Sequence, residues 1–182
     1  NKKDGNNAEY LYVPSVLGDR YGPNKKQYSR PCNKWKKMGS PITTDAPLEL
    51  LESILIEWGH WRGKSPKTNL KLLRAMYGLG CYHIITIGEW GFHASCKAGG
   101  GIVFDMCHTL PNNPIGDLTA VLLQQAASHY DNTDGLINRG AAVRGRQSRI
   151  AKEKRRPVAC VQLYRSAYTK GVLTNESKAQ FL

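Results

Sequence analysis

Residues 48–80 constrain the fold more than any other stretch, because two amphipathic patterns meet there at a Gly/Pro turn. In the first pattern Leu51, Leu55 and Trp58 recur at helical spacing, and the second repeats this spacing up to Tyr77. The patterns predict two helices joined within residues 59–66. This polar turn is expected at the surface, since its backbone groups need solvent. It brings together Trp61, Arg62, Lys64 and Lys67.

Length and charge limit the class of protein. The chain has 182 residues, which favours one domain. Lys and Arg number 26 against 14 Asp and Glu, a formal net charge of +12. So diffuse an excess indicates a partner of dense negative charge, which is nucleic acid, a nucleic-acid-coated protein or an anionic membrane leaflet.

The chain shows neither an apolar run long enough to span a bilayer nor an apolar segment of secretory type at its start. Its five cysteines are an odd number at irregular spacing, which favours free thiols in a reducing compartment. They are Cys32, Cys81, Cys96, Cys107 and Cys160.

The patterns predict an α+β fold. Residues 1–47 are basic and rich in Gly, Pro and Asn, so we expect an extended basic N-terminal arm. Residues 48–182 are expected to form a single compact domain, in which a small, mostly antiparallel sheet packs against two or three helices. The expected strands are 81–87, 89–95, 102–106 and 158–164, with a further helix at 117–130.

Residues 131–157 are Gly-rich and basic, and we expect them to form an exposed segment that contacts phosphates or acidic lipid headgroups. Close cations repel one another unless a partner neutralises them, although a solvated loop is the alternative. Residues 152–157 also resemble a nuclear import signal. The cations of this segment are Arg139, Arg144, Arg146, Arg149, Lys152, Lys154, Arg155 and Arg156.

Metal binding and catalysis find little support in the residue spacing. No zinc-binding pattern connects the candidate ligands, so buried thiols and ordinary sheet histidines are favoured, and no cofactor is predicted. No nucleophile elbow, phosphate loop or dinucleotide fingerprint occurs, so the chain is not expected to be an enzyme. The candidate ligands are Cys81, His83, His93, Cys96, Cys107 and His108, and a nuclease site would draw on Glu57, Glu89, Asp105, His60, His83 and His108.

The segment 48–80 resembles the corresponding part of rhabdovirus matrix proteins. The shared pattern is a helix ending in Trp and His two apart, a Gly-Lys-x-Pro turn, and a second helix with a Lys, aliphatic pairs and a Gly. The positions are Trp58, His60, Gly63, Lys64, Pro66, Lys71, Leu72, Leu73 and Gly78. The resemblance implies a non-enzymatic protein that self-associates, condenses the helical nucleocapsid and joins it to the inner face of the envelope.

The resulting hypothesis is a viral matrix protein, located in the virion beneath the envelope and in the host cytoplasm or nucleus. Its arm and basic segment would bind anionic lipid or nucleocapsid, and apolar residues would form a helical lattice. A direct RNA-binding protein, such as a nucleoprotein or ribosomal component, and a metal-dependent nuclease are the alternatives. The arm contributes Lys2, Lys3, Lys25, Lys26, Lys34, Lys36 and Lys37, and the residues expected to mediate self-association are Tyr10, Tyr12, Val13 and Trp61.

Overall fold

The computed structural model describes residues 8–18, 25–79, 82–97, 102–130, 135–141, 150, 152, 153 and 155–162. These residues form one seven-stranded sheet of order β2-β3-β4-β5-β6-β1-β7. All neighbouring strands are antiparallel except β5 and β6, which are parallel. The strands are β1 (Ala8–Tyr12), β2 (Thr43–Thr44), β3 (Tyr82–Thr86), β4 (Gly91–Lys97), β5 (Ile102–Thr109), β6 (Leu136–Ala141) and β7 (Ala159–Gln162).

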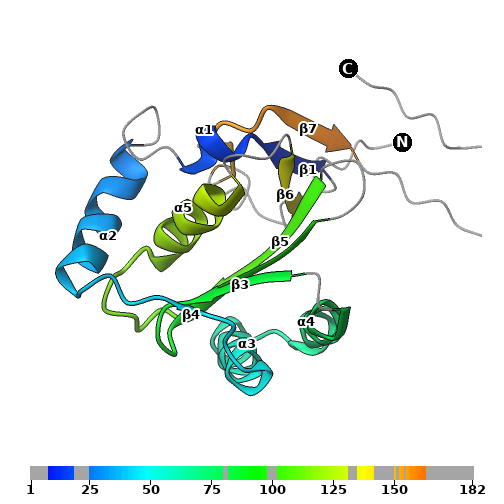
Figure 1. Ribbon diagram of the computed structural model, residues 1–182. Helices are drawn as coiled ribbons and strands as arrows, with labels where there is room; N and C mark the ends of the chain where they lie inside the picture. The colour runs from blue at the N-terminus through cyan, green and yellow to red at the C-terminus, as the bar shows by residue number, and fades with distance from the viewer. Residues whose placement is uncertain are drawn as a thin grey trace, which may run out of the picture.

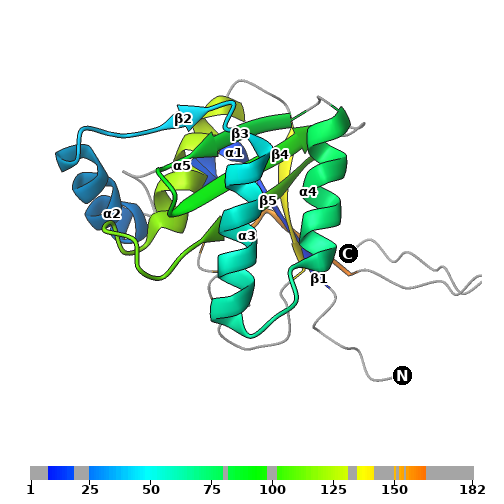
Figure 2. The same cartoon turned by 90° about the horizontal axis from the view of Figure 1, so that it is seen from below.

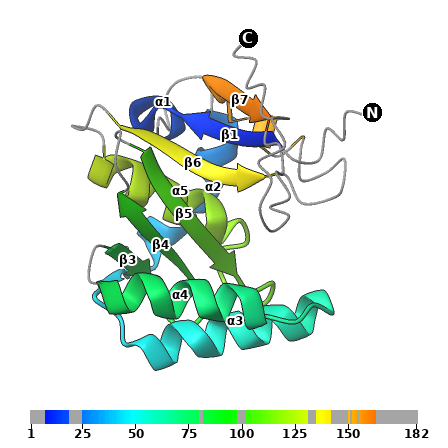
Figure 3. The same ribbon diagram turned by 90° about the vertical axis from the view of Figure 1, so that its right-hand side faces the viewer.

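Helices cover both faces of the sheet (Figure 1). On one face α5 packs against β3, β4 and β5, and α1 and α2 pack against α5. On the other face α3 packs against β4 and β5, and α4 packs against α3 and β3. Figure 3 shows that α3 and α4 cross only the β3–β5 part of the sheet. The helices are α1 (Pro14–Gly18), α2 (Lys25–Lys37), α3 (Leu48–Arg62), α4 (Lys67–Leu79) and α5 (Leu118–Tyr130).

The predicted compact α+β domain with a mostly antiparallel sheet is confirmed. The two helices of residues 48–80, the helix near 117–130 and the strands near 81–87, 89–95, 102–106 and 158–164 also occur. Strand β6 was not predicted, because its glycine and arginine resemble a loop. The sheet is larger than expected. Of the five helices among the described residues, α3, α4 and α5 pack on the sheet, which agrees with the two or three expected, and α1 and α2 pack against α5.

The extended arm predicted for residues 1–47 is wrong for the described part of that range. Strand β1 lies inside the sheet between β6 and β7. The next long segment forms α2, whose Tyr28, Cys32 and Trp35 are buried against α5. Their spacing of four and three residues makes one apolar helix face. The high density of lysine around these residues obscured that face in the sequence.

Two glycines shape the turn between α3 and α4. Gly63 ends α3 in the left-handed conformation, with φ 59° and ψ 35°, and its N–H bonds to the carbonyls of the preceding turn. At Gly59 a Cβ atom would lie 2.8 Å from the carbonyl oxygen of Lys64 and 3.1 Å from Pro66 Cδ. The absence of a side chain at Gly59 therefore lets the chain fold back against the helix.

No helix among the described residues is long and apolar enough to cross a membrane.

We predict that Gly59→Ala lowers the free energy of unfolding by roughly 1–3 kcal/mol, because the added methyl group meets the Lys64 backbone. Urea denaturation measures the change. Gly78→Ala in α4 is the matched control, since its Cβ meets nothing within 4 Å. That control should gain about 0.5–1 kcal/mol from helix propensity. Equal stability of the two variants would contradict the role of Gly59.

Candidate functional site

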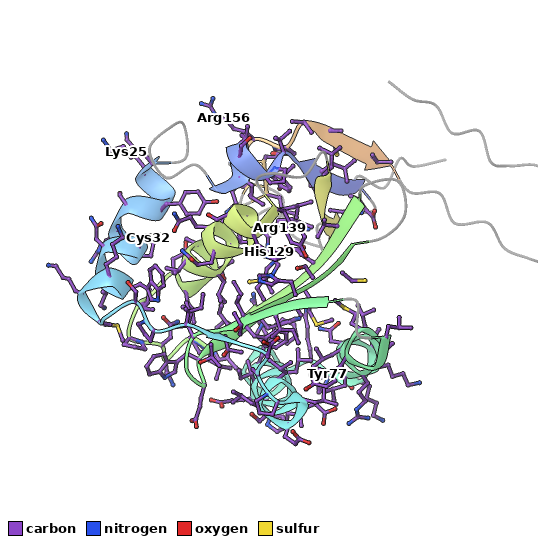
Figure 4. The ribbon with its side chains drawn as sticks, viewed as in Figure 1. Lys25, Cys32, Tyr77, His129, Arg139 and Arg156 are labelled. Atoms are coloured by element: carbon purple, nitrogen blue, oxygen red, sulfur yellow. The ribbon has the colours of Figure 1, made fainter. Side chains whose placement is uncertain are left out.

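The outer face of α2 carries a dense group of exposed cations. The helix contains no acidic residue, and none of its cations forms an ion pair with a described residue. Its inner face is held by apolar packing, and Trp35 Nε1 also donates a hydrogen bond to the Pro41 carbonyl at 2.9 Å. Figure 4 shows Lys25 projecting from one end of the helix. The members of this α2 basic face are Lys25, Lys26, Arg30, Lys34, Lys36 and Lys37.

Arg30 was not among the cations predicted to bind a polyanion, but it belongs to this face. Arg30 lies four residues from both Lys26 and Lys34, so a helical interpretation of the segment would have included it. The feature of the sequence that indicates this helix is the apolar spacing of Tyr28, Cys32 and Trp35.

A second feature is a cavity of about 320 Å³ where the last turn of α3 meets the loop between β5 and α5. Its wall includes Trp58, Trp61, Arg62, His108, Pro111 and Asn113. The cavity lies beside the α3–α4 turn that was singled out in the sequence. His108, Pro111 and Asn113 come from a distant segment, so sequence patterns did not connect them with this turn.

Hydrogen bonds hold the β5–α5 loop in one shape. The Asn113 side chain donates to the carbonyls of Leu110 and Gly116 at 2.7 and 3.1 Å. Its Oδ1 accepts from the N–H groups of Ile115 and Gly116 at 3.1 and 2.7 Å. The cavity wall on this side is therefore preorganised.

His108 forms the inner wall of the cavity. Its ring packs edge-on against Trp58 with centroids 4.4 Å apart, and its Nε2 lies 3.5 Å from Asn69 Nδ2. Burial lowers the pKa of His108 to about 4, so the ring is neutral at pH 7. The Nδ1 atom is buried without a hydrogen-bond partner among the described residues.

Trp61 and Arg62 form the outer rim of the cavity. Trp61 is 53% exposed, whereas Trp58 is half-buried against the core under α3. The Arg62 guanidinium carbon lies 4.7 Å from the centre of the Trp61 ring. Lys64 and Lys67 are exposed on the adjoining turn. The structure thus places the four turn residues at one surface, as the sequence predicted.

The basic segment predicted at 131–157 is not an exposed strip over its described part. Arg139 lies in β6, with its side chain 12% exposed and its Nε 3.0 Å from Asp105 Oδ2. Arg155 is buried, and the Lys152 ammonium donates to the Arg139 carbonyl. Arg156 is exposed (Figure 4). The residues Lys2, Lys3, Arg144, Arg146, Arg149 and Lys154 lie outside the described part of the chain.

The phosphate-binding prediction is therefore wrong for Arg139 and Arg155, which serve the protein interior. The position of Arg139 on β6 directs its side chain toward the interior, where it meets the buried carboxylate of Asp105. His93 Nε2 also lies 3.3 Å from Asp105 Oδ2. Burial raises the pKa of Asp105, but Arg139 and His93 together bring it down to about 2, so the carboxylate stays ionised.

Tyr10 and Tyr12 cannot insert into a neighbouring subunit, because both are buried in their own fold. They pack with Leu17, Val103 and Ile137 around β1. The Tyr12 hydroxyl donates to the Lys152 carbonyl at 2.9 Å. Val13 is half-buried, so Trp61 is the exposed member of the group predicted to mediate self-association.

The residues considered for a nuclease do not converge. Asp105 and His108 are three apart on one strand, so they face opposite sides of the sheet. His83 stacks on His129, with ring centroids 3.6 Å apart. Within the described ranges, no group of three or more His, Cys, Asp or Glu is placed to hold a metal ion.

Comparison with known proteins adds a fold and no family. No family model matches the chain, and no curated protein matches it. A solved structure of a conserved protein of unknown function from Bacteroides thetaiotaomicron is similar, with a TM-score of 0.68 at 14% sequence identity. The match covers 86% of this chain and 57% of that protein. At this identity the likeness shows a shared fold alone.

We predict that Arg139→Ala lowers the free energy of unfolding by about 3–5 kcal/mol, because it leaves the Asp105 carboxylate buried without its main partner. Denaturant titration at pH 7 measures the loss. The control Arg156→Ala changes an exposed side chain and should stay within about 0.5 kcal/mol. A small effect in both variants would show that the buried pair does not stabilise the fold.

We predict that stability falls as the pH drops from about 6.5 to about 4. Burial lowers the pKa of both His83 and His108 to about 4, so the unfolded chain takes up these protons first. His129 and His93 reinforce the shift at His83, whereas Asp45 opposes it. The contribution of Asp105 is lost only at lower pH, as the pH falls below its ordinary value of 3.8 to about 2.

Urea titrations at pH 7.5, 5.5 and 4.5 measure this loss, which is on the order of 2 kcal/mol for the deeply buried His108 and smaller for His83, because solvent screens its half-exposed ring. His108→Gln should reduce it, whereas His60→Gln, at an exposed position of α3, should leave it in place. A stability that is constant over this range would contradict the assignment.

Proposed function

We propose that the protein is a non-enzymatic structural protein of matrix type. In this proposal the α2 basic face binds an anionic membrane leaflet, and another surface of the same domain engages the nucleocapsid. The proteins then assemble with one another beneath the viral envelope. The main observation behind the proposal is the α2 basic face. Its cations are exposed and form no ion pair with a described residue, and the helix contains no Asp or Glu.

The α2 basic face suits a flat polyanionic surface. Each basic residue near an anionic membrane contributes about 1 kcal/mol, and the attraction falls off within a Debye length. Because Tyr28, Cys32 and Trp35 anchor the helix, the charges are displayed on a folded element. Binding therefore avoids the entropy cost of ordering a flexible arm. A domain-borne face thus serves the role that the sequence assigned to an extended arm.

The arrangement of helices also supports a linking role. The α2 basic face belongs to the helix layer on one side of the sheet, and the α3–α4 turn belongs to the layer on the other. Figure 2 shows α2 well away from the turn. Two separate cationic surfaces allow one domain to contact two anionic partners at the same time.

The shared matrix-protein pattern divides into structural and exposed positions. Gly63 and Leu73 serve the turn and the core, so folding explains them. Lys64, Lys71 and Leu72 are exposed, and packing does not explain them. These exposed positions favour a binding role for the hairpin. Self-association is assigned to the exposed apolar residues of α3 and α4, which include Ile56, Leu72 and Leu79.

The test is sedimentation with vesicles that contain or lack phosphatidylserine. We predict that the full chain binds the anionic vesicles, and that replacing Lys34, Lys36 and Lys37 with Gln weakens binding roughly a hundredfold. The control with equal charge change replaces Lys64, Lys67 and Lys71 with Gln, and should bind these vesicles much like the wild type. Equal binding to neutral vesicles, or equal losses in both variants, would overturn the membrane role of α2.

A further inference from the structure

We propose that the cavity at the end of α3 binds one base of a single-stranded nucleic acid, with Trp61 stacking on the base and Arg62 contacting a flanking phosphate. This inference goes beyond the proposed membrane function, because it concerns a separate surface. It uses residues that neither the core nor the α2 basic face requires.

The size and lining of the cavity suit a base with its sugar. Ligand pockets commonly measure about 300–1,000 Å³, and this cavity of about 320 Å³ lies at the small end of that range. Its wall combines the Trp58 and Trp61 rings with polar groups of Arg62, Asn113 and Thr119, and the exposed lining is more polar than apolar. Such a wall offers an aromatic surface to a planar base and hydrogen-bonding groups to its polar edge.

Trp61 is the group best placed for stacking. Trp61 is 53% exposed, so packing in the core does not explain a tryptophan at this position. Stacking of a base on an aromatic side chain is worth about 1–3 kcal/mol and tolerates any base. The Arg62 guanidinium, 4.7 Å from the ring centre, is held by this cation–π contact at the cavity rim.

The charge around the cavity favours a phosphate backbone. From Trp58 to Lys71 the sequence has four cations and no Asp or Glu. Arg62, Lys64 and Lys67 form no ion pair with a described residue. Of the nearby acids, Glu57 lies a turn earlier on α3, and Asp117 accepts a hydrogen bond from the Ala120 N–H at 3.3 Å as it caps α5. The cationic rim therefore stays unneutralised.

The same observations disfavour other occupants. A second copy of the chain, with a formal charge of +12, would bring further cations to this basic rim, so self-association suits the exposed apolar residues of α3 and α4 better than the rim itself. A lipid headgroup would engage the cations without needing a recessed aromatic wall. A base and its phosphate match both features.

The test compares two labelled oligonucleotides of equal length and charge, hexauridylate and an abasic chain. We expect the full-length wild type to prefer the base-bearing chain by about 5- to 150-fold in fluorescence anisotropy, the range that one stacked base supplies. Trp61→Ala should abolish this preference, and Trp61→Phe should restore most of it. Val158→Ala is the control, because it truncates an apolar side chain of similar exposure, 54%, that lies just before β7 and outside the α3–α4 hairpin.

Arg62→Gln should weaken binding of both oligonucleotides and reduce the salt slope by about one. Hexathymidylate distinguishes DNA from RNA, and binding to either supports the proposal. No preference for bases in the wild type, or a preference that survives Trp61→Ala, would overturn it. Dimerisation that depends on Trp61, without base preference, would also overturn it and assign the cavity to a second copy. The Lys34, Lys36 and Lys37 variant should keep its base preference, so failure of the membrane proposal remains distinguishable.

Discussion

The buried carboxylate of Asp105 connects the two parts of the sheet, and the rest of the structure depends on that connection. Asp105 lies on β5, between His93 on β4 and Arg139 on β6. The parallel β5–β6 pairing joins the β2–β5 part of the sheet to β6, β1 and β7. A buried ion pair gains little over apolar packing, but separating its members is costly, so it penalises any other register of these strands. Beside these strands, Tyr12 of β1 and Ile137 of β6 pack with Leu17 of α1 and Tyr130 of α5, so the position of β6 and β1 also fixes this part of the helix layer.

This arrangement converts an ordinary excess of positive charge into distinct surfaces. Arg139 pairs with Asp105 in the interior and is not available to a partner, whereas the cations on α2 remain exposed and form no ion pair with described residues. The α3–α4 turn carries a smaller cationic rim beside an aromatic cavity on another part of the molecule. Net charge predicts attraction to polyanions in general. The fold divides that attraction between a broad face suited to a membrane and a recess suited to a base.

Local patterns predicted the elements that depend on neighbouring residues in the chain. The hairpin of α3 and α4 follows from apolar spacing and from the turn chemistry of Gly63 and Pro66. The predicted extended arm is wrong because the apolar face of α2 is short and lies among many lysines, which hide its helical spacing. The basic segment was misassigned because Arg139 pairs with a residue 34 positions away. No local pattern distinguishes such an arginine from an exposed one.

The sequence by itself determined the α+β class, the helical hairpin, the exposed turn around Trp61 and the excess of positive charge. These properties follow from short-range periodicity, glycine conformation and composition. Only the tertiary structure decided that Tyr10 and Tyr12 are core residues and that Arg139 faces inward. It also decided that Trp61 borders a cavity with His108. Burial and cavity shape depend on which distant segments pack together, and that information lies in the long-range pairing of strands and helices.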